Sequence, residues 1–168
     1  MIRRTVILVT LAGLGCQTQR SNSNVWEFSG NDPEMRAAID SARRTVAVLM
    51  ARLQAPPRAS QTYLSVKVRL GTDSVGEHIW LDGVQVAGTL LRGQLNEDAV
   101  AIEGAKAGQW VTVRPDSISD WMVIDNGVLC GGYTVRVERS RLSDADRARL
   151  DFGLLDLGLR SWATTNEC

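Results

Sequence analysis

Residues 33–70 read PEMRAAIDSARRTVAVLMARLQAPPRASQTYLSVKVRL, and the spacing of their apolar residues changes once. In residues 33–54, apolar side chains recur every three or four positions, which is the period of a helix with one buried side. The pair Pro56-Pro57 ends this pattern, because proline cannot continue a helix. From Tyr63 to Leu70, apolar and polar residues alternate, as they do in a strand with one buried and one hydrated face.

The rest of the chain continues in strands and closes with a second helix. Asp32 can cap the first helix, and Pro33 suits its first turn. Asp82-Gly83 and Asp125-Asn126-Gly127 are typical of tight turns between strands. Ser143 can cap a second helix, which we expect to stop near Gly153. Further strands are expected near residues 77–81, 84–94, 110–114, 121–125 and 128–138.

This order of elements predicts an α+β domain. We expect a long N-terminal helix packed on a curved, mainly antiparallel, barrel-like sheet, followed by a short C-terminal helix. The predicted divisions are a leader (1–15), a lipidated cysteine with a flexible tether (16–30), the α+β domain (31–142) and a C-terminal helix and tail (143–168).

The first sixteen residues, MIRRTVILVTLAGLGC, have the layout of a secretory signal. Two arginines precede an apolar run that is too short to cross a bilayer as a helix. The ending Gly13-Leu14-Gly15-Cys16 resembles a bacterial lipobox, in which the cysteine is lipidated, although Gly13 departs from the usual leucine. We therefore predict an exported protein, anchored through Cys16 to the periplasmic face of a bacterial membrane, the outer one in preference. An ordinary cleaved signal and a buried apolar strand are the alternatives.

With Cys16 assigned to lipid, two cysteines remain, and export would place them in an oxidising compartment. A bond between Cys130 and Cys168 would pin the C-terminal tail to the domain; two unpaired thiols are the alternative.

The composition argues against several classes of partner. Basic and acidic side chains balance at 19 each, so no basic surplus exists to attract nucleic acid. The single histidine, His78, and scattered acids fit no common zinc site. We expect no metal and no cofactor.

The stretch EHIWLDG, residues 77–83, contains that histidine. In a strand, Glu77, Ile79 and Leu81 share one face, and His78, Trp80 and Asp82 share the other. Because Glu77 and His78 point apart, they form a poor acid–base pair. His78, Trp80 and Asp82 are candidate binding residues, and a packing role for them is the alternative.

A second candidate group is in SISDWMVIDNGVLCGGY, residues 117–133. Asp120 can cap a turn, and it can also orient His78 if the two strands are close. Trp121 and Tyr133 are further candidate binding residues, Tyr133 because the preceding Gly131-Gly132 indicates a bulge or a close backbone approach.

The stretches AAIDSARRT, VKVRL, EHIWL, GQWVTVRPDSISDWMVIDNG and GGYTVRV occur in this order along the chain. Together they resemble the YegJ-like family, domain of unknown function 2314, from about Asp32 to Val137. The resemblance implies a bacterial protein, often exported, with no established activity, and it supplies no catalytic residues.

Three functions remain as hypotheses. The first is a non-catalytic binding module at the cell envelope, with a protein, peptide or glycan partner. The second is a hydrolase that uses His78 and Asp120 with Ser117 or Ser119, although the chain lacks the G-x-S-x-G nucleophile motif. The third is an immunity-type protective protein. The balance of these arguments leans against an enzyme.

Overall fold

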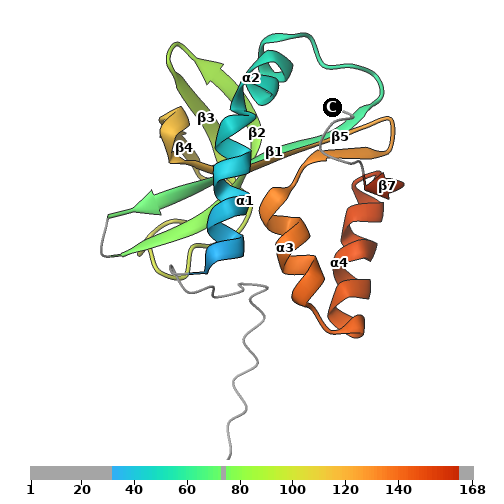
Figure 1. The fold of residues 1–168 in the computed structure, drawn as a ribbon. Helices are drawn as coiled ribbons and strands as arrows, with labels where there is room; N and C mark the ends of the chain where they lie inside the picture. The colour runs from blue at the N-terminus through green and yellow to red at the C-terminus, as the bar shows by residue number, and fades with distance from the viewer. Residues whose placement is uncertain (1–31, 73–74, 163–168) are drawn as a thin grey trace, which may run out of the picture.

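The computed structural model describes residues 32–72 and 75–162, so the predicted leader, Cys16, the tether and Cys168 lie outside the described residues. The described chain combines one seven-stranded sheet with four α-helices (Figure 1). In chain order the elements are α1 (Pro33–Arg44), α2 (Val46–Gln54), β1 (Gln61–Gly71), β2 (Gly76–Ala87), β3 (Leu90–Leu95), β4 (Trp110–Val113), a 3-10 turn (Pro115–Ser117), β5 (Ile118–Asp125), β6 (Val128–Gly131), α3 (Tyr133–Arg141), α4 (Asp144–Asp156) and β7 (Ser161–Trp162).

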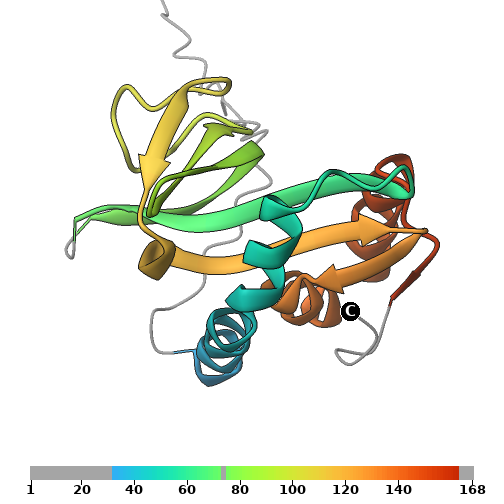
Figure 2. The ribbon, with the colours of Figure 1, turned by 90° about the horizontal axis from the view of Figure 1, so that it is seen from above.

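The sheet is open, with strand order β4-β3-β2-β1-β5-β6-β7. All neighbouring strands are antiparallel except β6 and β7, which are parallel. The α+β class and the mainly antiparallel sheet are thus confirmed, whereas the barrel-like shape is wrong. Helices cover both faces of the central strands (Figure 2), so these strands are buried without closure of the sheet.

The long N-terminal helix is also wrong as predicted, because the chain breaks at Thr45 into α1 and α2. The indole Nε1 of Trp121 donates to the carbonyl of Ala42, 3.2 Å away, which in a continuous helix would accept from Val46. The hydroxyl of Thr45 donates to the carbonyls of Ser41 and Ala42. Side chains inserted into a helical hydrogen-bond ladder are a known cause of such breaks.

The capping predictions are confirmed at both helices. Asp32 accepts from the backbone N–H groups of Glu34 and Met35, and Ser143 accepts from that of Asp146. The C-terminal helix, however, runs through Gly153 to Asp156, so it is longer than predicted.

Two glycine-containing segments differ from their predictions. Asp82-Gly83 makes no turn, because β2 continues through it with a register shift before Gln85. The predicted strand 128–138 ends at Gly131, and α3 follows. Gly131 has φ +72°, and a Cβ there would lie 2.1 Å from the carbonyl oxygen of Trp121, so only glycine fits this bend.

Two apolar clusters lie on the two faces of the sheet. The first face packs against α1 and α2 around Val66, Ile79 and Trp121. The second face packs against α3 and α4 around Met122 and Leu154.

Within residues 32–72 and 75–162, no helix is both long and apolar enough to span a bilayer.

Candidate functional site

The predicted site residues are divided between the two faces of the sheet. His78, Trp80 and Asp82 lie on the second face, because the register pairs them with Arg69, Lys67 and Ser65 of β1. Glu77, Ile79 and Leu81 lie on the first face, as the alternation predicts. Trp121 and Tyr133 are in the core.

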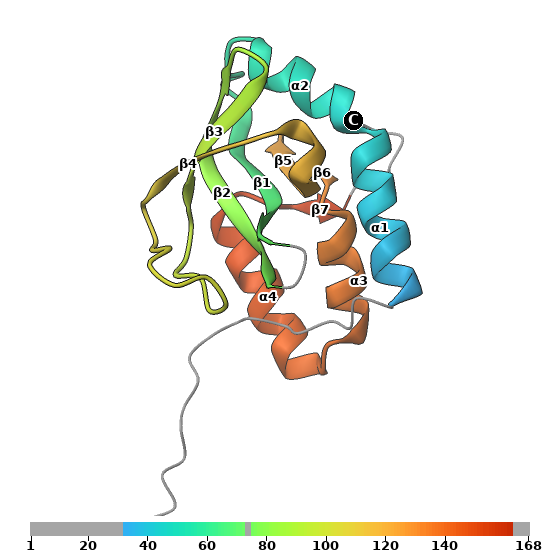
Figure 3. The same ribbon diagram turned by 90° about the vertical axis from the view of Figure 1, so that its left-hand side faces the viewer.

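On β2, β3 and β4 the second face forms a surface that we call the open face. The register aligns Asp82 with Gln94 and Gln94 with Trp110 across three strands. Among the residues that the structure describes, no helix lies over β3 and β4 on this side, since α3 and α4 pack against β5 and β6 (Figure 3). The open face consists of His78, Trp80, Asp82, Arg92, Gln94, Trp110 and Thr112.

Lys67 marks the border between the open face and the helices. Its Nζ atom lies 2.9 Å from Oε1 of Glu138 on α3, and both side chains are largely buried. The same ammonium group lies 5.5 Å from the centre of the Trp80 ring. This cation therefore fixes one edge of the open face to α3 and holds the Trp80 ring in place.

His78 is exposed yet carries little positive charge at neutral pH. Partial burial of the imidazole, together with the nearby cations Lys67, Arg69 and Arg43, lowers the pKa of His78 to about 4. No carboxylate among the described residues is hydrogen-bonded to it. The neutral ring can donate and accept hydrogen bonds with a partner, but nothing orients it as a general base.

Asp82 shares its carboxylate with Tyr63. The tyrosine hydroxyl donates to Oδ1 of Asp82 over 2.8 Å. Burial, and the bond to the carboxylate, raise the pKa of Tyr63. The hydroxyl of Tyr63, on the neighbouring strand β1, therefore fixes the position of the Asp82 carboxylate.

Trp110 and Arg92 were not among the residues predicted from the sequence to form a site. Trp110 is 40 % exposed on the edge strand, and the guanidinium of Arg92 lies 4.5 Å from its ring centre. The alternation of residues 110–114 was the available signal, since it places Trp110 and Thr112 on one face.

Asp120, the weak catalytic candidate, has the contacts of a structural residue. Its carboxylate accepts from the backbone N–H groups of Trp121, Tyr133 and Thr134, and from the hydroxyl of Thr134 at 2.6 Å. The side chain is fully buried at the start of α3. With these partners it caps α3 and leaves no free oxygen to orient His78.

Trp121 and Tyr133, the further candidate binding residues, lie in the core. Trp121 is 1 % exposed and Tyr133 9 %, and their rings meet edge to face at 6.1 Å. Both side chains pack in the apolar cluster that includes Ala38 and Ala42 of α1.

The hydroxyls of the two serines proposed for a hydrolase are both hydrogen-bonded to backbone carbonyls. The hydroxyl of Ser117 donates to the carbonyl of Arg114, and that of Ser119 to the carbonyl of Lys67. Neither is bonded to His78. Across the described part of the chain, no group of three or more His, Cys, Asp and Glu side chains is placed to hold a metal ion.

Cys130 lies in β6 and is 5 % exposed. Its predicted partner, Cys168, lies outside the described residues, so the disulfide stays a prediction.

Comparison with known proteins places these features in a family. The family described as "Uncharacterized protein conserved in bacteria (DUF2314)" matches residues 32–155. A protein of Neisseria meningitidis serogroup B, named "Putative ankyrin repeat protein", is 28% identical over 137 residues, which cover 77% of this chain and 54% of that protein. The "Uncharacterized protein YegJ" of Escherichia coli K12 is 28% identical over 71 residues, which cover 42% of this chain and 46% of that protein. The chain thus spans about half the length of these curated relatives. No solved structure matches.

Proposed function

The chain belongs to the DUF2314 family of uncharacterized bacterial proteins, and we propose that it acts as a binding module whose contact surface is the open face. The observation that carries this proposal is the composition of that face. An exposed Trp110 and a stacked Arg92 lie on β4 and β3, whose second face no described helix covers, and a fixed Asp82 lies beside them on β2.

The side chains of the open face suit recognition of a partner. Tryptophan and arginine are enriched among the residues that contribute most to binding. The rings of Trp80 and Trp110 are held by cations, so little side-chain entropy is lost on contact. The partner class remains as the sequence predicted, an envelope protein, a peptide or a glycan.

A named relative supports a role in macromolecular contacts. The Neisseria protein carries the name of an ankyrin repeat protein, and ankyrin repeats stack into extended binding surfaces. We therefore favour a protein partner.

Hydrolysis is disfavoured, because Asp120, Ser117 and Ser119 each bond to neighbouring groups and His78 has no orienting acid.

We further propose that the module is exported and anchored by lipid on Cys16. The apolar leader that ends in Gly15-Cys16 supports this. Intact-mass spectrometry of the protein from its native membrane tests it: an acylated cysteine at the new N-terminus is expected. A retained Met1 without an acyl group would contradict both the anchor and the predicted envelope location.

The binding role is tested by site-specific photo-crosslinking in native envelopes. A photoreactive amino acid replaces Thr112 on the open face or, as a matched control, Ala148 on the exposed side of α4. We expect a discrete adduct from position 112 that disappears when Trp110→Ala is added, with an unchanged melting temperature. Equal adducts at both positions, or an adduct that persists with Trp110→Ala, would contradict the proposal.

A further inference from the structure

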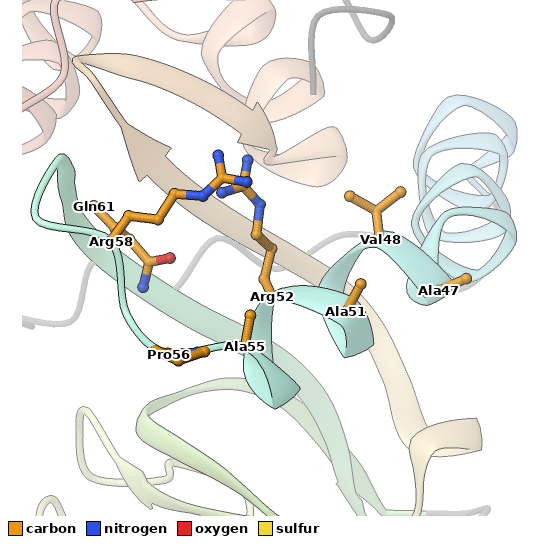
Figure 4. Close-up of a pocket in the computed structure, with 8 residues that line it drawn as sticks. All are labelled: Ala47, Val48, Ala51, Arg52, Ala55, Pro56, Arg58 and Gln61. Carbon is orange, nitrogen blue, oxygen red and sulfur yellow. The ribbon is translucent and has the colours of Figure 1, made fainter.

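A depression lies beside α2 (Figure 4). Because α2 packs on the first face of the sheet, the depression lies on the side opposite the open face. Its volume is about 440 Å³, within the range of known ligand sites. The surface of α2 contributes small apolar side chains, and the segment that leads into β1 contributes the opposite side. The lining residues are Ala47, Val48, Ala51, Arg52, Ala55, Pro56, Arg58 and Gln61.

Two arginines in this depression share a single carboxylate. Arg52 Nη1 lies 2.7 Å from Oδ2 of Asp125, and Arg58 Nη1 lies 3.2 Å from the same oxygen. The other oxygen of Asp125 accepts from the hydroxyl of Ser60 at 2.6 Å. Two positive charges against one negative charge leave the depression with a net positive charge.

The two guanidinium groups have different roles. The Arg52 side chain is 15 % exposed and its pair with Asp125 joins α2 to the end of β5. The Arg58 side chain is 63 % exposed, and within the described chain it makes a single hydrogen bond, through Nη1. Each guanidinium has five N–H donors, so Arg58 retains donors for an incoming anion.

We propose that this depression binds the free C-terminal carboxylate of a peptide whose last residues are apolar. A carboxylate matches the planar fork of Arg58. The methyl groups of Ala51 and Ala55, with the ring of Pro56, offer an apolar surface for the terminal side chain, and the amide of Gln61 can donate to or accept from the peptide backbone.

The openness of the depression favours a chain end over a small molecule. Small-molecule sites usually enclose most of the ligand surface. Here five lining residues, Ala47, Ala51, Ala55, Pro56 and Arg58, are exposed to solvent. A peptide end can be held by its carboxylate while the rest of the peptide leaves along the surface, so an open depression suffices.

Fluorescence anisotropy of a labelled peptide with the full chain tests the proposal. The probe is a Gly-Ser repeat that ends in Leu-Val with a free carboxylate, and its partner probe is the same peptide with an amidated end. We expect the free acid to bind about tenfold more tightly than the amide, since a hydrogen bond to a charged group is lost in the amide. Equal binding of the two probes, or no saturable binding of either, would overturn the proposal.

Three variants locate the contact. Arg58→Gln should remove most of the preference for the acid without loss of fold, because the side chain is largely exposed. Ala51→Trp should fill the depression and weaken both probes. Arg149→Gln, an exposed arginine on α4, is the control and should bind like the unaltered chain. An unchanged preference in Arg58→Gln would refute the assignment, independently of any result on the open face.

Discussion

The start of α3 and the open face both contain acidic and aromatic residues, yet they differ in what their polar atoms do. At α3, the Asp120 carboxylate has four donors and the indole of Trp121 has two acceptors. On the open face, His78 is hydrogen-bonded to no described residue and Trp110 remains exposed.

The difference separates polar groups that stabilise the fold from polar groups that are free to contact a partner. A buried polar group costs free energy unless it is hydrogen-bonded, so the α3 region must be satisfied from within the domain. A polar group on an open sheet face can instead exchange water for a partner. Measurements of stability and of ionisation can therefore test this contrast.

The largest effect is expected for Asp120→Ala. It leaves three buried N–H groups and a hydroxyl without an acceptor, so the free energy of unfolding should fall by about 4 kcal/mol or more. Urea denaturation measures this. Asp116→Ala, at an exposed carboxylate, should change little. Similar losses in the two variants would remove the structural role assigned to Asp120.

A smaller effect is expected for Trp121→Phe. The ring is retained in part, but the carbonyl of Ala42 and the hydroxyl of Thr45 lose the indole donor, at a cost of about 2 kcal/mol in the free energy of unfolding. Trp110→Phe should stay within about 0.5 kcal/mol of the original chain. Thermal denaturation of both variants measures this. A larger loss of stability in Trp110→Phe than in Trp121→Phe would contradict the division between core and open face.

Lys67→Met tests the border between the two regions. The aliphatic stem is kept, while Glu138 loses its partner and Trp80 its cation, so we expect a loss of about 1–2 kcal/mol. A double-mutant cycle with Glu138→Gln isolates the ion pair. Additive losses would mean that Lys67 and Glu138 do not interact.

The smallest effect concerns the ionisation of His78. An NMR titration of this single histidine should have its midpoint at about 4, below the 6.5 of an unperturbed imidazole. Because folding favours the neutral ring, His78 supports stability fully above pH 6.5 and progressively less as the pH falls towards 4. Lys67→Met removes a nearby cation and should raise the midpoint. A midpoint near 6.5 in the original chain would show that the ring is neither desolvated nor surrounded by cations.

Periodicity predicted the parts of the fold that depend on local sequence. The strand 63–70, the helix caps at Asp32 and Ser143 and the turn at Asn126-Gly127 are all present. The break at Thr45 could not be predicted from local sequence, because one of the side chains inserted there is the indole of Trp121, which lies 76 residues further along the chain.

Long-range contacts also determine which of the predicted site residues are accessible. Strand alternation correctly placed His78, Trp80 and Asp82 on one face. Asp120 and Trp121 have the residue types of a site, but α1 and α3 cover them, and only the fold determines which strands a helix covers.

The ion pairs at the start of α1 have a mechanical consequence. Arg141, at the end of α3, binds both Asp32 and Glu34, and the interaction with Arg141 holds the pKa of Asp32 well below its usual range. Tension applied through the preceding chain would enter the domain at Asp32. It would reach the ion pairs with Arg141 together with the first turn of α1, so α1 and the end of α3 would share the load.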